Sequence, residues 1–71
     1  MMPEQYIILI DHMIELRKTK GWTQKDLSAA CGLTQSVIAR IESKKSVPTI
    51  ITLQRIVSAL DATLILKKQE D

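Results

Sequence analysis

Cysteine, histidine and aromatic residues are scarce in this 71-residue chain. Cys31 and His12 are each the only residue of their type, so one chain can form neither a disulfide framework nor a cluster of Cys and His metal ligands. We therefore expect no metal and no other cofactor. Phenylalanine is absent, and two glycines and two prolines provide few turns. These shortages argue against an all-β fold and favour short helices around an aliphatic core.

Long hydrophobic runs are missing as well. The longest run near the start, Tyr6 to Ile10, is far shorter than the roughly 20 residues of a membrane span, and no basic segment precedes it. We therefore expect a cytoplasmic protein with no membrane partner and no removable leader. Because a chain of this length holds a single hydrophobic core, we expect neither a second catalytic domain nor a sensor domain.

The charges are distributed unevenly along the sequence. The stretch from Arg17 to Lys45 contains seven basic and two acidic residues, whereas the remainder contains three basic and six acidic residues. A basic middle between acidic flanks is what a nucleic-acid surface confined to one face would produce. A run of like charges is, however, more often a solvated face, so the charge pattern alone does not assign a function.

The spacing of apolar residues predicts four helices. We expect them over about residues 4–20, 24–31, 35–43 and 50–60. Gly21 and Gly32 follow the first two helices, and a threonine that can cap the free backbone N–H groups precedes the second, the third and the fourth helix. Only about three residues separate the second helix from the third, so these two helices must cross at a steep angle.

The first and third predicted helices carry distinct faces. The main apolar stripe of the first helix comprises Tyr6, Leu9, Met13 and Leu16, and a second stripe beside it, which needs a cover, comprises Ile7, Ile10 and Ile14. At 100° per residue, the third helix places Gln35, Ser36, Ala39 and Arg40 in one open arc. The opposite arc, which we expect to face the core, holds Val37, Ile38 and Ile41.

The C-terminal segment differs in kind from the helices. Thr63, Leu64, Ile65 and Leu66 form a β-branched and apolar run with no helical period. We therefore predict a short β-strand. Because a lone strand leaves its backbone groups unpaired, it needs a partner, which is most simply the same strand of a second copy. Residues 62–71 then form a dimerisation tail after a helical domain of residues 1–61.

Two short capped helices, the second with an open polar face, are the components of a helix-turn-helix DNA reader. The segments Gly21–Leu27 and Gly32–Glu42, followed by Pro48-Thr49 and Leu53, resemble the Cro/C1 (Xre) family of helix-turn-helix repressors. The resemblance implies a mainly α, lambda-repressor-like domain of four to five helices. The Gly-Trp-Thr-Gln turn and the Leu-Asp-Ala-Thr-Leu-Ile-Leu tail resemble those of HipB-type antitoxins, in which a C-terminal strand pairs across the dimer. HigA-type antitoxins and small phage regulators share most of these features.

The resemblance to this family also implies roles for individual residues. The residues that it places against base edges are Gln35, Ser36 and Arg40, where Gln suits adenine and Arg suits guanine. The residues that it places against DNA phosphates are Gln24, Thr34, Ser43, Lys44 and Lys45. Arg17 and Glu42 match a partly buried ion pair. Lys44 stands where the family commonly has glycine, and a lysine at positive φ costs about 1 kcal/mol, so we expect this loop to be shaped differently here.

The leading hypothesis is a homodimeric repressor that binds an inverted-repeat operator in bacterial double-stranded DNA. The resemblance to HipB-type antitoxins implies that this repressor is an antitoxin that regulates its own operon, with a cognate toxin as a further partner. The alternatives are a phage or plasmid regulator of the same fold, or a protein-interaction module that does not read DNA. An enzyme is the least favoured class, because no nucleophile, base and orienting group can be named, and no small-molecule ligand is expected. We expect Cys31 to be buried, His12 to be solvated and Trp22 to cap the core.

Overall fold

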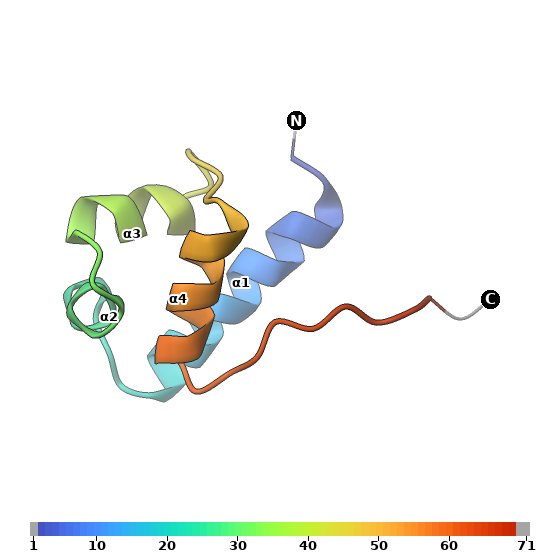
Figure 1. The fold of residues 1–71 in the computed structure, drawn as a ribbon. Coiled ribbons are helices and arrows are strands. Elements are labelled where there is room, and N and C mark those ends of the chain that lie inside the picture. Colours follow the sequence, from blue (N-terminus) through green and yellow to red (C-terminus); the bar gives the residue numbers. More distant parts are fainter. Residues whose placement is uncertain (1, 70–71) are drawn as a thin grey trace.

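The computed structural model describes residues 2–69, which form four helices joined by short loops. The helices are α1 (Glu4–Thr19), α2 (Gln24–Cys31), α3 (Gln35–Glu42) and α4 (Ile50–Ala59). They lie where the apolar spacing predicts them, and the described residues contain no fifth helix. In Figure 1, α2 is seen end-on while α3 lies across the view, so these two helices cross steeply. The predicted helix-turn-helix arrangement is therefore present.

Threonine hydroxyls start the three shorter helices, as predicted. Thr23, Thr34 and Thr49 each accept a hydrogen bond from the backbone N–H three residues further along the chain. At α2 the bond is reciprocal, because the Asp26 carboxylate in turn accepts from the backbone N–H of Thr23. Each such cap satisfies a backbone donor that the helix itself leaves unpaired.

Gly32 ends α2 in a left-handed conformation, with φ of 73°. A side chain there would be strained by this φ, and its Cβ would lie 2.7 Å from Nη2 of Arg55. That Arg55 nitrogen donates to the carbonyl oxygens of Cys31 at 2.9 Å and of Gly32 at 3.1 Å. Because these carbonyls form the C-terminal end of α2, the arginine of α4 caps α2 and fixes the start of the turn into α3.

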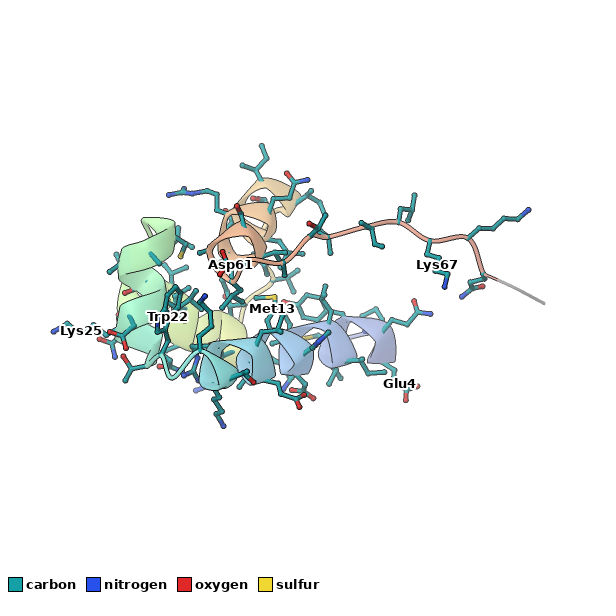
Figure 2. All side chains as sticks on the ribbon, turned by 90° about the horizontal axis from the view of Figure 1, so that it is seen from below. Glu4, Met13, Trp22, Lys25, Asp61 and Lys67 are labelled. Carbon is teal, nitrogen blue, oxygen red and sulfur yellow. The ribbon has the colours of Figure 1, made fainter. Side chains whose placement is uncertain are left out.

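All four helices contribute to the core. Its buried apolar residues are Ile10, Met13, Leu27, Cys31, Ile38, Ile41, Leu53, Ile56, Val57 and Leu60. Figure 2 shows Met13 between α1 and α4. The prediction that places Ile10 in the second apolar stripe, outside the main core-facing one, is wrong, since Ile10 is fully buried in the core with an exposed fraction of 0%. The buried line of α1 consists of Ile10, Met13 and Arg17, and it includes a polar residue that hydrophobicity does not identify.

The C-terminal segment leaves the helices after Asp61 and runs outward as an extended chain (Figure 1). Leu64 packs against the core, whereas Ile65 and Leu66 are exposed. The predicted strand over residues 63–66 is not formed within residues 2–69. A strand requires hydrogen bonds to a neighbouring strand, and residues 2–69 contain no second strand that could pair with this segment.

Three isolated residues behave as expected. Cys31 is buried, with its thiol 3.8 Å from the Ser28 carbonyl oxygen, and His12 is exposed. Trp22 is partly buried against the core, and the Lys20 ammonium lies 4.7 Å from its ring centroid.

Within residues 2–69, no helix has the length and hydrophobicity of a membrane span, and no three His, Cys, Asp or Glu side chains are grouped as metal ligands would be.

Candidate nucleic-acid interface

The outward face of α3 carries the three residues that were expected to meet base edges. Gln35, Ser36 and Arg40 are all exposed. The edges of this face differ from the prediction, because Val37 is 37% exposed and Ala39 is partly buried. The buried arc is centred on Ile38, Ile41 and Glu42, since Glu42 turns inward. A prediction from hydrophobicity alone places a glutamate on the solvent side. The predicted buried arc of α3 is therefore shifted away from Glu42 and toward Val37.

A buried ion pair accounts for the inward turn of Glu42. Nε of Arg17 donates to Oε2 of Glu42 at 2.8 Å, and Nη2 donates to Oε1 at 2.9 Å. The two side chains are 9% and 7% exposed. Nη1 of Arg17 donates to the Trp22 carbonyl oxygen at 2.7 Å. One guanidinium therefore joins the end of α1, the turn before α2 and the end of α3. Its bidentate contact also balances the negative charge of Glu42, which is unfavourable at a helix C-terminus.

The polar side chains expected at phosphates are already engaged within the protein to different degrees. Nε2 of Gln24 donates to Oε1 of Glu42 at 3.1 Å, and Gln24 is partly buried. The Thr34 hydroxyl accepts from the Val37 N–H at 3.2 Å, and the Ser43 hydroxyl donates to the Arg40 carbonyl oxygen at 3.1 Å. Thr34 and Ser43 remain exposed, so both flank the outward face of α3.

The loop after α3 keeps the shape that a glycine would adopt. Lys44 has φ of 64°, so the expectation of a differently shaped loop is wrong. Nζ of Lys44 lies 2.6 Å from Oδ1 of Asp11, and the Tyr6 hydroxyl donates to the Ser46 carbonyl oxygen at 3.5 Å. Burial raises the pKa of Tyr6, while the nearby charge of Lys44 opposes that rise. These contacts with α1 compensate the backbone strain at Lys44.

The basic residues between 17 and 45 separate into two groups. Three of them form ion pairs with carboxylates: Arg17 with Glu42, Lys20 with Asp61, and Lys44 with Asp11. The four that are exposed and have no ion pair within the described part of the chain are Lys18, Lys25, Arg40 and Lys45. Figure 2 shows Lys25 pointing away from α2 into solvent. Among the basic residues of this stretch, these four are the ones that can meet an anionic partner without first breaking an ion pair.

Sequence reasoning missed the role of Arg55, which holds the end of α2 from α4. The two positions are more than 20 residues apart, and nothing in the local sequence distinguishes this arginine from a solvated one. The same holds for Asp11 and Asp61, whose lysine partners come from distant segments. Only the assembled helices bring these charges together.

Comparison with known families agrees with this geometry. A family model described as helix-turn-helix matches residues 13–66, which include α2, α3 and α4. The chain belongs to the helix-turn-helix family of the Cro/C1 (Xre) type. No solved structure matches it significantly.

Several curated transcriptional regulators share this helix-turn-helix domain. The HTH-type transcriptional regulator SutR of Escherichia coli is 34% identical over 47 residues, and an HTH-type transcriptional regulator of Haemophilus influenzae is 36% identical over 58 residues. The HTH-type transcriptional regulator y4dJ of Sinorhizobium fredii is 38% identical over 45 residues. These matches cover 66%, 82% and 63% of this chain. The matched regions make up 26%, 59% and 58% of the relatives, so each relative is longer than its match.

Proposed function

We propose that this chain is a sequence-specific DNA-binding transcriptional repressor. The observation that carries the proposal is the exposed polar face of α3. Lys25 on α2 and Lys45 in the loop after α3 are exposed cations that form no ion pair within residues 2–69. Family membership and the three HTH-type regulators support the same function. In this proposal α3 enters the major groove, which admits an α-helix and displays a distinct donor and acceptor pattern for each base pair.

The proposed contacts follow from exposure and charge. Gln35, Ser36 and Arg40 read base edges. The residues that meet phosphates are Gln24, Thr34, Ser43, Lys44 and Lys45. Of the two lysines, Lys45 should make the stronger phosphate contact, because it is exposed and forms no ion pair among the described residues. Lys44 can bind a phosphate only after its ion pair with Asp11 is broken. Free N–H groups at the starts of α2 and α3 add favourable partial charge for an anion.

Replacing Arg40 and Lys45 separately tests the division between base and phosphate contacts. Arg40→Ala is expected to relax base preference at one position of each half-site, at a cost of about 1 to 3 kcal/mol. Lys45→Ala is expected to weaken binding to all sequences alike and to reduce the salt slope by about one unit. A binding array over a random-sequence library at several salt concentrations distinguishes the two effects. An unchanged sequence profile for Arg40→Ala would contradict the proposed base-reading role.

We propose further that the repressor is a homodimer held by its C-terminal tail. Ile65 and Leu66 are exposed and lie at an apolar groove of about 360 Å³. The residues that line this groove are Leu9, Ile50, Leu53, Leu64, Ile65 and Leu66. Antiparallel pairing of residues 63–66 in two copies supplies the missing backbone hydrogen bonds and covers apolar surface. A two-fold dimer then presents two α3 helices to an inverted repeat whose half-site centres are about 10 bp, or roughly 34 Å, apart or a multiple of that spacing.

Removal of residues 62–71 tests the proposed dimer interface. The truncated chain should sediment as a destabilised monomer and lose most of its operator affinity, because each unit contacts only one half-site. A tight dimer that survives the deletion would assign dimerisation to the helices instead. The readout therefore separates the role of the tail from that of α3.

The antitoxin role is the narrowest part of the proposal. It rests on the resemblance of the turn and tail to HipB-type antitoxins, and on two exposed aliphatic residues outside α3 and outside that apolar groove that a protein partner could cover, Val47 and Ile51. A toxin-like reading frame next to this gene, whose product copurifies with the chain and leaves α3 free, is the expected finding. A solitary gene favours a phage or plasmid regulator. Binding to a protein without any DNA preference would favour an interaction module.

A further inference from the structure

Two glutamines occupy the same position in successive helices. Gln24 and Gln35 are each the first residue of a helix, and each follows a capping threonine. Gln24 is partly buried, and its amide nitrogen lies 3.1 Å from Oε1 of Glu42. Gln35 is exposed, and its side chain has no hydrogen-bond partner among residues 2–69. The protein therefore holds one of these carboxamides and leaves the other free.

The group that holds Gln24 is itself rigidly placed. Both carboxylate oxygens of Glu42 accept hydrogen bonds from Arg17, at 2.8 and 2.9 Å. Oε1 also accepts from Gln24, so this oxygen is shared between α1 and α2. The positive charge of Arg17 balances the carboxylate, so an incoming phosphate near Gln24 meets a neutral amide and not a net negative charge.

A side-chain amide nitrogen carries two hydrogens. When one hydrogen of Gln24 Nε2 points at Glu42, the amide plane can no longer flip, and the second hydrogen keeps a fixed direction. An ordered donor binds more tightly than a free one, because the entropy of immobilising the side chain has been lost before the ligand arrives. The expected gain from ordering one side chain is about 2- to 10-fold in Kd.

We propose that Glu42 is a positioning residue for DNA binding, which holds the Gln24 carboxamide so that its second N–H meets a DNA phosphate at the start of α2. The inference rests on the proposed function of the chain. Glu42 is the last residue of α3, so the helix that reads bases also sets the phosphate contact of its neighbour. The two contacts thereby keep a constant spacing, and α3 enters the groove in one register.

The test uses the full-length chain and a duplex that it selects from a random-sequence library. Ethylation interference identifies the phosphate facing α2, and a second duplex carries a single uncharged methylphosphonate at that phosphate. Wild type should bind the modified duplex more weakly. Glu42→Asp keeps the charge beside Arg17 but withdraws the carboxylate by one methylene. It should lose about 2- to 10-fold in affinity for the normal duplex and lose most of its sensitivity to the methylphosphonate. Gln24→Ala should behave in the same way.

Gln35→Ala is the matched control, because it removes the other first-position carboxamide. It should change base preference and retain full sensitivity to the methylphosphonate. Side-chain ¹⁵N relaxation gives a readout that needs no DNA: in the wild type the Gln24 amide should be rigid and the Gln35 amide mobile, and Glu42→Asp should release Gln24. If Glu42→Asp does not fold, the inference is tested by the relaxation of the wild-type protein and by the binding of Gln24→Ala to the normal and the modified duplex.

Two outcomes would overturn the inference. One is a Gln24 amide as mobile as that of Gln35 in the wild type. The other is full methylphosphonate sensitivity in a folded Glu42→Asp variant. Failure of the proposed function looks different, since the wild type then selects no sequence from the library and shows no protected phosphate, whatever the relaxation data report.

Discussion

The two helices of the helix-turn-helix begin with the same dipeptide, Thr-Gln, yet the two starts differ in structure. At α2 the Thr23 hydroxyl accepts from the Asp26 N–H at 3.1 Å, and the Asp26 carboxylate accepts from the Thr23 N–H at 2.9 Å. At α3 the Thr34 hydroxyl accepts from the Val37 N–H at 3.2 Å, and Val37 has no group to return the bond. The start of α2 is therefore closed by reciprocal bonds, whereas the start of α3 has a single cap.

This difference matches the roles proposed for the two helices. A phosphate contact is the same at every base sequence, so it benefits from a donor whose direction is fixed in advance. A glutamine that reads adenine must present a donor and an acceptor together, and both groups have to be free of the protein. The Thr-Gln pair can therefore serve a phosphate contact or a base contact. Which of the two it serves depends on the third residue of the helix, and on whether a distant carboxylate such as Glu42 holds the glutamine.

The largest expected effect comes from breaking the ion pair that supports the start of α2. Glu42→Ala strands the Arg17 guanidinium in a buried site, and we expect it to lower the free energy of unfolding by about 3 kcal/mol or more. Arg17→Ala should cost a similar amount, and the double variant less than the sum. Urea unfolding of the four proteins of this cycle gives the coupling energy directly. A coupling energy near zero would show that the two groups lie apart or in water.

The next effect contrasts Gln35 with Gln24 on DNA. Gln35→Ala should reduce discrimination at one base pair of each half-site by about 1 to 3 kcal/mol, because a bidentate contact is lost. Gln24→Ala should weaken binding by the same factor on every sequence. A binding array run on both variants measures the contrast. Equal loss of base preference in the two variants would mean that the glutamines at the starts of α2 and α3 do not differ in function.

The sequence was sufficient to predict the elements of this fold but not all of its contacts. Helix bounds, threonine caps and the glycine stops follow from local rules, which is why the extent of α2 was predicted to the residue. The burial of Ile10 and the exposure of Val37 depend on how the helices are rotated against one another, and the buried contact of Glu42 with Arg17 is part of that packing. Apolar spacing does not include such a polar interaction.

The candidate interface shows the same division. The open arc containing Gln35, Ser36 and Arg40 follows from helical geometry, because exposure on one short helix is a local property. The hydrogen bond that holds Gln24 joins residues 18 positions apart and was not predicted. The tail illustrates a third case, since the strand predicted over residues 63–66 has no partner strand among residues 2–69.

A smaller effect is expected from removing each threonine cap. Thr34→Ala should lower the free energy of unfolding by about 1 kcal/mol, the usual value for a single cap. Thr23→Ala should cost about the same or somewhat less, because it removes only the hydroxyl bond, and the backbone N–H of residue 23 can still donate to Asp26. Chemical denaturation of both variants under identical conditions gives the comparison. A clearly larger loss at Thr23 would contradict the view that the returned bond from Asp26 supports the start of α2.

The smallest effect is a pH dependence that only the start of α2 should show. Hydrogen bonds from Thr23, the backbone N–H first, lower the pKa of Asp26 below its ordinary value of 3.8. The ionised carboxylate therefore favours the folded state. This contribution is complete above the pKa of the unfolded chain, and it is lost as the pH falls through the lower pKa of the folded state. Asp26→Asn should be less stable than wild type at neutral pH, and the difference should shrink in strong acid.

Val37→Asp sharpens this last prediction, because it places a carboxylate at the matching position of α3. Val37 is 37% exposed, so the substitution removes little apolar contact and can form a second capping box with Thr34. We expect the variant to be at least as stable as wild type at neutral pH and to lose more stability on acidification, since it has two such carboxylates. Urea unfolding between about pH 2 and pH 7 measures both profiles. An acid profile identical to that of wild type would show that the carboxylate makes no cap at α3, so the difference between the two starts would then depend on more than the residue at the third position.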